Sequence, residues 1–216
     1  VLDDNKILTL ANGDRMPMTD MCKIMFEVET LKNASPATVS RAGIIYVSDT
    51  DLDWSPVGEG IIRLRPEAQR DPLRAIVAKY MGESSPIYPG TMFNFIIRNC
   101  APVQEADRVG LVCSCFDLLS GLLDTHNDEP PPVRLAKDDP ARLAVQLERI
   151  FLYCACWGVA GLLDSDDRAK VDGWIRSIDD TGMPACGEKE TIYEYFLDEN
   201  AEWQPWKPPK WTYPNT

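Results

Sequence analysis

The sequence predicts an α/β fold, in which a short strand-rich N-terminal part precedes a longer helical part and an extended tail. An Asn12-Gly13 pair between two apolar stretches indicates a β-hairpin near the start. A Ser35-Pro36 helix start lies between two short apolar runs that are typical of buried strands. From Trp54 onward the apolar residues recur at helical spacing, which places the helices in the second part.

The predicted hairpin joins residues 6–10 to residues 16–18, because Asn and Gly both tolerate the positive φ of a tight turn. Residues 22–28 (CKIMFEV) are short, largely apolar and bounded by polar residues. This pattern predicts a buried strand. The C-terminal end of that strand reaches Glu29 and Thr30.

A short helix is predicted next. Ser35 offers its hydroxyl to the first free amides, and Pro36 loses nothing by lacking an amide hydrogen at the first helical position. Gly43 in a left-handed conformation would end the helix, and residues 44–47 (IIYV) then predict a second buried strand. Arg41 therefore lies in the last turn of a helix of about two turns, directly before a strand.

The helical signal is strongest in residues 105–124 and 141–163. In the first segment, apolar residues recur three and four apart and form one stripe, made of Val109, Val112, Phe116, Leu119 and Leu123. The second segment predicts a long, very apolar helix that we expect to bend at Gly158 or Gly161. Further helices are predicted over residues 73–80, 88–98 and 168–178, and residues 191–197 have the β-branched and aromatic content of a strand.

The closing stretch interleaves aromatic residues with prolines, which cannot continue a helix or a central strand. It contains Trp203, Trp206, Trp211 and Tyr213 among Pro205, Pro208, Pro209 and Pro214. We favour an extended segment that covers an apolar surface. The alternative is a ligand for the aromatic-lined grooves of recognition domains.

Composition excludes several functional classes. The formal net charge of −12 repels phosphate backbones and anionic lipid heads, so no nucleic acid or membrane partner is expected. Seven cysteines without dense spacing argue against a secreted disulfide scaffold and favour a reducing, cytosolic setting. The start has no signal-peptide pattern, and the apolar run over residues 150–163 is shorter than the roughly 20 residues that span a bilayer.

Candidate chemistry within the chain is sparse. No glycine-rich loop followed by Lys and Ser or Thr is present to cradle phosphates. The single histidine, His126, lies in an acidic, proline-rich stretch, and we interpret it as an exposed loop residue. The pairs Cys113/Cys115 and Cys154/Cys156 are two residues apart in predicted helices and face nearly opposite sides. We therefore expect small core residues there and predict no metal site.

Three stretches near the N-terminus closely resemble the second AAA+ module of dynein heavy chains. They are residues 1–6 (VLDDNK), 8–15 (LTLANGDR) and 34–46 (ASPATVSRAGIIY). A looser similarity continues through residues 147–152 with 157–158 and through residues 191–196 with Trp203 and Trp206, so the resemblance spans nearly the whole chain. The segment LANGDR is more similar to outer-arm axonemal dyneins than to cytoplasmic ones.

The resemblance implies three parts. Residues 1–57 would be the C-terminal part of a P-loop AAA+ large subdomain, residues 58–180 a helical AAA+ small subdomain, and residues 181–216 a linker and the start of the third module. Both Walker motifs of the module would precede Val1. We therefore expect this segment to hydrolyse no ATP alone, although the parent chain would be an ATP hydrolase.

The resemblance also implies roles for single residues. Arg41 matches the arginine finger that one AAA+ module offers to ATP on the preceding module, although a cation in the last turn is also favoured by the helix dipole, by roughly 0.3–1 kcal/mol. Glu29 and Thr30 stand where AAA+ proteins place a polar γ-phosphate sensor, often Asn, so a sensing and a structural role both stay open. Candidates for a small-subdomain phosphate contact are Arg98, Arg108 and Arg149.

For the complete motor, the resemblance implies ATP or ADP with Mg as cofactors. It implies neighbouring AAA+ modules, microtubules and dynein intermediate and light chains as partners, and a location in the cytoplasm and cytoskeleton, in the axoneme of a cilium or flagellum. The alternative function is a degenerate, AAA+-derived interaction protein without catalytic activity that binds partners through its Trp/Pro tail. A Walker A motif upstream in the same reading frame would exclude this alternative.

Overall fold

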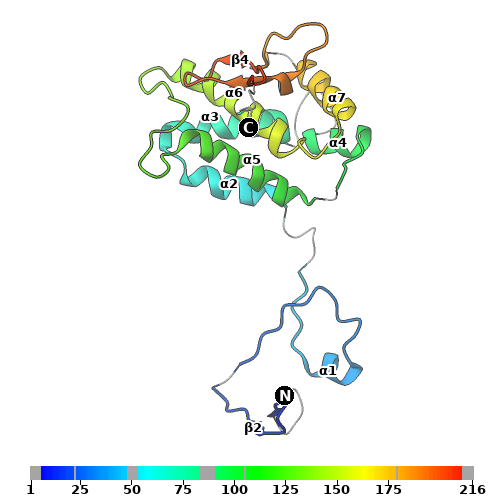
Figure 1. Cartoon of the computed structure of the whole chain (residues 1–216). Helices are drawn as coiled ribbons and strands as arrows, with labels where there is room; N and C mark the ends of the chain where they lie inside the picture. The colour runs from blue at the N-terminus through cyan, green and yellow to red at the C-terminus, as the bar shows by residue number, and fades with distance from the viewer. Residues whose placement is uncertain are drawn as a thin grey trace, which may run out of the picture. The chain divides into compact units, whose positions relative to one another are not determined.

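The structure is a computed structural model that describes residues 6–21, 23–47, 53–82, 91–104, 106–178 and 180–210. The chain divides into two compact units, Val1–Asp51 and Leu52–Thr216, and each is described by itself (Figure 1). The predicted boundary between residues 57 and 58 falls inside helix α2 (Trp54–Leu64). The assignment of three AAA+ parts to the chain stays a prediction.

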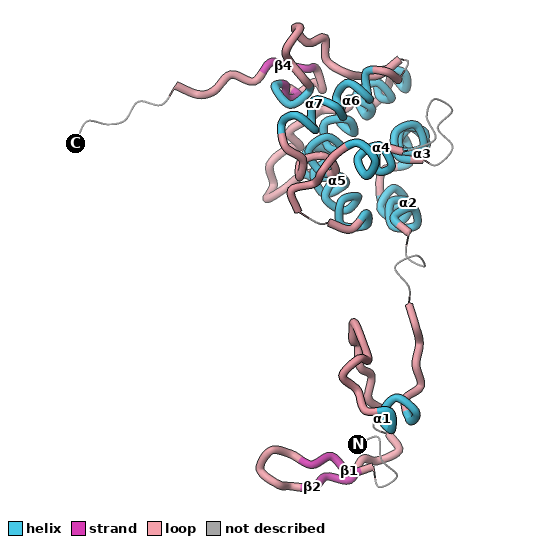
Figure 2. The backbone as a smooth tube through the Cα atoms, turned by 90° about the vertical axis from the view of Figure 1, so that its right-hand side faces the viewer, coloured by secondary structure: helices cyan, strands magenta, loops and turns pink. Residues whose placement is uncertain are grey.

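The predicted hairpin near the N-terminus is confirmed (Figure 2). Strands β1 (Ile7–Thr9) and β2 (Arg15–Pro17) pair antiparallel, with Leu8 opposite Met16. Gly13 lies in the turn with a φ of 89°, a conformation that side chains with a Cβ rarely adopt. Gly13, on which the hairpin prediction rested, therefore also allows the turn to form.

The short helix α1 (Pro36–Arg41) also forms where the sequence predicts it. The Ser35 hydroxyl accepts a hydrogen bond from the Thr38 amide at 3.2 Å, and Pro36 occupies the first turn. The expected left-handed Gly43 is wrong, because Gly43 is outside the positive-φ region. Ala42 ends the helix in an extended conformation, and its amide donates to the Val39 carbonyl.

The two predicted buried strands, over residues 22–28 and 44–47, do not form as predicted. Cys22 lies outside the described residues, and the rest of both segments is exposed and without strand structure, with Met25 96% and Ile45 90% exposed. A strand is stabilised by ladder hydrogen bonds and by packing against neighbours. Within the described part of this unit the only sheet is the hairpin, so neither segment has a strand to pair with.

The second unit is a helical bundle with a small hairpin on one side (Figure 1). Helices α2 and α5 pack together, as do α3 and α6, and the most extensive packing is between α5 and α6. Besides α2, the elements are α3 (Glu67–Met81), α4 (Met92–Asn99), α5 (Arg108–Leu123), α6 (Pro140–Gly158), α7 (Ser165–Arg176), η1 (Ile192–Glu194), β3 (Tyr195–Leu197) and β4 (Trp203–Pro205). All the predicted helices are present with shifted ends, but predicted residues 88–90 and 105 lie outside the described residues.

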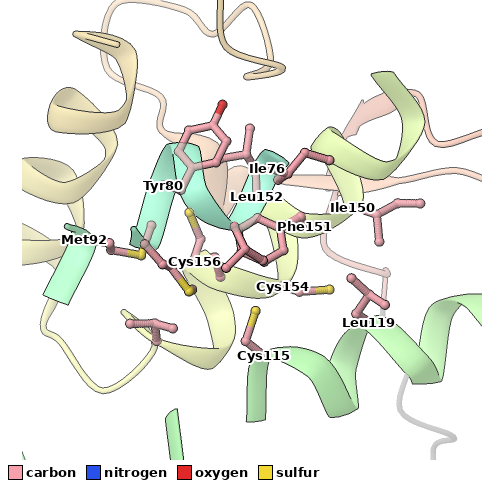
Figure 3. Packing of buried hydrophobic residues seen from close by; sticks show 14 of the residues in the cluster. Ile76, Tyr80, Met92, Cys115, Leu119, Ile150, Phe151, Leu152, Cys154 and Cys156 are labelled. Carbon is pink, nitrogen blue, oxygen red and sulfur yellow. The ribbon is translucent and has the colours of Figure 1, made fainter. Parts of the chain in front are cut away.

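Helix α6 forms the centre of the core (Figure 3). Phe151 is fully buried there, stacked on Tyr80 of α3 and edge-on to Phe116 of α5. Cys115, Cys154 and Cys156 are also fully buried, which confirms the interpretation of these three as small core residues. Cys113 is only partly buried.

The predicted bend of α6 at Gly158 or Gly161 is wrong, because the helix ends at Gly158. The chain then turns sharply, with the Val159 and Ala160 amides both donating to the Ala155 carbonyl. Gly158 itself marks a close approach between helices. A Cβ at this position would lie 2.7 Å from the Cα of Cys115.

The strand predicted over residues 191–197 is half right. Residues 192–194 form the 3₁₀ helix η1, because Thr191 and Glu194 make a reciprocal capping box. Only Tyr195–Leu197 is a strand, and it pairs antiparallel with β4, with Phe196 opposite Gln204. Among the described residues, no helix is both long and apolar enough to cross a membrane.

Candidate functional site

The structure places Arg41 at the C-terminal end of the capped helix α1, with an exposed side chain. The cap at Ser35 fixes where the helix begins, and six helical residues later the chain leaves it. A guanidinium is planar, permanently charged and carries five donors, so an exposed one is suited to a phosphate. Arg41 is therefore an exposed, permanently charged residue in the last turn of a short helix.

Glu29 and Thr30 lie in the exposed segment that leads to α1. The Thr30 hydroxyl accepts a hydrogen bond from the Lys32 amide at 3.2 Å, which makes a local turn. This contact supports a structural role for Thr30. A role for either residue toward a nucleotide stays a prediction.

The three candidate arginines of the helical unit have different surroundings. Arg149 is tied within the chain, because its Nη1 pairs with the Glu202 carboxylate at 2.5 Å and donates to the Ala201 carbonyl at 3.2 Å. Arg108 is exposed at the start of α5, with its guanidinium 5.9 Å from the centre of the Phe93 ring. Arg98 is exposed in the last turn of α4. Arg108 and Arg149 contact different residues, Phe93 in the first case and the Ala201 carbonyl and Glu202 in the second.

Arg108 borders a groove of about 670 Å³ between α4, the start of α5 and the turn after α6. Its walls are largely apolar and are made of Phe93, Ile96, Ile97, Pro102, Gln104, Ala106, Asp107, Leu111, Val159 and Leu162. The sequence gives no sign of this groove, because its two sides come from segments about fifty residues apart. The Val103 amide joins them by donating to the Leu162 carbonyl at 3.1 Å.

A buried carboxylate holds the end of α4 against α7. Asp167 is 5% exposed and accepts hydrogen bonds from the Lys170 ammonium at 2.5 Å and the Ala101 amide at 2.6 Å. Lys170, and then the Ala101 amide, lower the pKa of the Asp167 carboxyl below its ordinary value. The ionised carboxylate therefore helps to position α4 and the loop that borders the groove.

The C-terminal segment covers part of the helical bundle, as the favoured interpretation of the tail predicts for Trp203. The Trp203 indole donates to the Gly182 carbonyl at 2.7 Å, and its ring lies 6.3 Å from that of Tyr153. Trp206 is 58% exposed, so its use as a partner ligand stays a prediction. Trp211 and Tyr213 lie outside the described residues.

His126 is exposed in the loop after α5, as predicted, with its Nε2 3.4 Å from the Ser120 carbonyl oxygen. Within the part of the chain that the structure describes, no group of three His, Cys, Asp or Glu residues could hold a metal ion.

The helical unit matches a known protein family. Residues 88–208, more than half of the chain, match the dynein heavy chain AAA lid domain. The chain belongs to the dynein heavy chain family. The match covers the groove, the Asp167 contact and the whole β3–β4 hairpin, so these features lie within a AAA lid.

Axonemal proteins are among the relatives of this dynein segment. It is 39% identical to the dynein gamma chain of the flagellar outer arm of Chlamydomonas reinhardtii, over 99% of this chain. It is 33% identical to dynein axonemal heavy chain 5 of Mus musculus and 32% identical to dynein axonemal heavy chain 2 of Homo sapiens, each over 99% of this chain. The chain spans 4% of the length of each of these three relatives.

Proposed function

We propose that this chain is a segment of the motor ring of an axonemal dynein heavy chain, and that Arg41 acts as an arginine finger toward ATP on the preceding AAA+ module. The observation that carries the proposal is the position of Arg41, an exposed residue at the end of the capped helix α1, within the segment that resembles the second module. In phosphoryl transfer, charge builds on the transferring oxygens, and a guanidinium stabilises it. The helical unit would serve as the lid of the same module.

The exposed apolar segments of the first unit support its place in a larger sheet. Phe26 is 67% exposed and Tyr46 is 83% exposed, and both lie in stretches with the composition of buried strands. Exposing contiguous apolar side chains to water is unfavourable, so such stretches mark surfaces that a partner covers. In the proposed module these stretches would be covered by other parts of the AAA+ large subdomain.

The proposal includes the cofactors and partners of the complete motor. ATP or ADP with Mg would bind between modules, with Arg41 reaching the nucleotide from the neighbouring side and Glu29 or Thr30 near the module's own γ-phosphate. The partners would be the adjoining AAA+ modules, microtubules and dynein intermediate and light chains. The relatives' names, which specify a flagellar outer arm and axonemal heavy chains, support the axoneme of a cilium or flagellum as the location.

The test is ATP hydrolysis in the complete heavy chain that carries Arg41→Ala. Single-turnover hydrolysis at the preceding module is expected to slow by roughly 10³-fold or more, because a finger of this kind contributes that much to the rate. Arg41→Lys should restore little of the loss, since an ammonium lacks the forked donor geometry.

The matched control is Lys32→Ala, which removes an exposed cation from the same unit but outside α1. It should leave hydrolysis unchanged. If the Arg41→Ala motor hydrolyses ATP at the preceding module as fast as the Lys32→Ala motor does, Arg41 has no catalytic role.

A further inference from the structure

One face of α6 forms a polar seat for the β3–β4 hairpin. Gln146 is 3% exposed, and its amide group makes three hydrogen bonds. Its nitrogen donates to the Asn200 carbonyl at 2.9 Å and to the Arg134 carbonyl at 3.2 Å, while its oxygen accepts from the Ala136 amide at 2.7 Å. Both donors of this side chain are used, and so is its acceptor oxygen.

Two more side chains on α6 extend the seat. Arg149 follows Gln146 by three residues and binds the Ala201 carbonyl and the Glu202 carboxylate. Tyr153, four residues further on, packs against the Trp203 ring. Spacings of three and four residues put these side chains along one face of the helix.

The hairpin turn is built to fit this seat. The Asp198 carboxylate accepts from the Asn200 and Glu202 amides at 2.9 and 3.0 Å, and these backbone hydrogen bonds contribute to lowering its pKa. Ala201 is fully buried with a φ of 58°. A non-glycine residue in this left-handed region persists only where its surroundings hold it there. Here the Arg149 contact to the Ala201 carbonyl is part of those surroundings.

We propose that Gln146 is a positioning residue that fixes the β3–β4 hairpin on α6, so that the hairpin moves as one body with the lid and passes its motion to the chain beyond Trp206. The Trp206 amide still belongs to the hairpin, since it donates to the Glu194 carbonyl at 2.7 Å. The lid match ends at residue 208, directly after it. The inference rests on the proposed function, in which lid movement must reach the next module.

The first experiment measures amide hydrogen exchange in the 216-residue chain with Gln146→Met, which keeps the size of the side chain and removes its three hydrogen bonds. Losing them leaves the Asn200 carbonyl of the hairpin turn without its partner, together with the Arg134 carbonyl and the Ala136 amide of the loop before α6. The Arg134 amide in turn donates to the Glu199 carbonyl of the hairpin. Exchange in residues 195–206 should therefore accelerate about tenfold or more while α5 keeps its protection. Val145→Ala, an exposed neighbour on α6, is the control and should exchange like the unaltered chain.

Arg149→Met provides an independent variant, because this side chain is 23% exposed and binds the Ala201 carbonyl and the Glu202 carboxylate of the hairpin turn. It should loosen the same residues. If α5 and α6 lose protection together with the hairpin in both variants, the residues support the whole bundle and the proposal is overturned. Unchanged exchange in residues 195–206 overturns it as well.

The second experiment uses the complete heavy chain and compares microtubule gliding speed with ATP turnover. Gln146→Met should slow gliding several-fold at nearly unchanged turnover, because the motion of the lid is lost in a loose hairpin. Normal gliding with a loosened hairpin would overturn the coupling role. This readout is distinct from that of Arg41→Ala, where hydrolysis itself should fall, so either proposal can fail without the other.

Discussion

Both units of the chain contain apolar runs, but these runs are buried only in the helical unit. Every buried apolar residue among those described lies between Trp54 and Ala201, in the helical unit. The first unit has apolar runs as well, but helix α1 has no buried residue and the flanking segments are exposed. Turns and caps form in both units, because they need only neighbouring residues. Apolar side chains are buried only where the described part of the chain also supplies the element that packs against them.

The largest expected contrast between the units comes from a matched pair of phenylalanines. Phe151→Ala should lower the free energy of unfolding by about 3–5 kcal/mol, since it leaves a cavity between Tyr80 and Phe116. Phe26→Ala should change it by less than about 0.5 kcal/mol, because that side chain is 67% exposed. Urea unfolding of the 216-residue chain, followed by circular dichroism, measures both.

Phe151→Leu keeps this comparison testable if the alanine variant does not fold. It should lower the free energy of unfolding by less than Phe151→Ala does, because it removes fewer buried atoms from the same place. A loss at Phe26 as large as that at Phe151 would show that the first unit has a core of its own.

The sequence predicts the parts of this fold that depend on local patterns. The stripe on α5 is confirmed by the burial of Val112, Phe116 and Leu119, and the Ser35 cap starts α1 where the residues indicate. The strand predicted over residues 44–47 is wrong for a physical reason. Its apolar, β-branched composition favours a strand only where neighbouring strands pack against it and bury it.

The polar contacts of the lid could not be predicted in the same way. Gln146 binds a carbonyl 54 residues away, and Asp167 binds an amide 66 residues away. A glutamine within an apolar helix suggests a buried polar contact only weakly, since the sequence does not show which residue it binds. For Arg41 the reverse holds. A specific local sequence identifies the residue, but its expected target, the nucleotide, lies on another module.

Two glycines provide a smaller contrast. Gly158→Ala should destabilise the chain by about 1–3 kcal/mol, because the added Cβ would meet backbone atoms of Cys115 at 2.7 Å and force α5 and α6 apart. Gly43→Ala meets nothing within 4 Å and has no positive φ to lose. It should leave stability unchanged or raise it by less than about 1 kcal/mol. Equal losses in urea unfolding would contradict the close packing of α5 on α6.

The smallest contrast concerns two acidic residues and depends on pH. The pKa of Asp167 is lowered in the folded chain by Lys170 and by the Ala101 amide, so its ionised form stabilises the fold. That contribution is complete above the unfolded pKa of about 3.9 and is lost as the pH falls through the lower folded value. Asp20 pairs with Lys6 at 3.3 Å, but their side chains are 92% and 65% exposed, and such pairs contribute little.

Asp167→Asn should therefore lower the urea midpoint at pH 7 and flatten its decline between about pH 5 and pH 3, whereas Asp20→Asn should leave the curve unchanged. The asparagine side chain can still accept a hydrogen bond from the Ala101 amide but cannot form an ion pair with Lys170. The difference between Asp167→Asn and the unaltered chain therefore measures the contribution of the carboxylate charge. A parallel decline for Asp167→Asn and the unaltered chain would show that other carboxyls govern the acid response. In that case the α4–α7 contact is held by packing, such as that of Phe95 on Trp174, and the ionic part of it is dispensable.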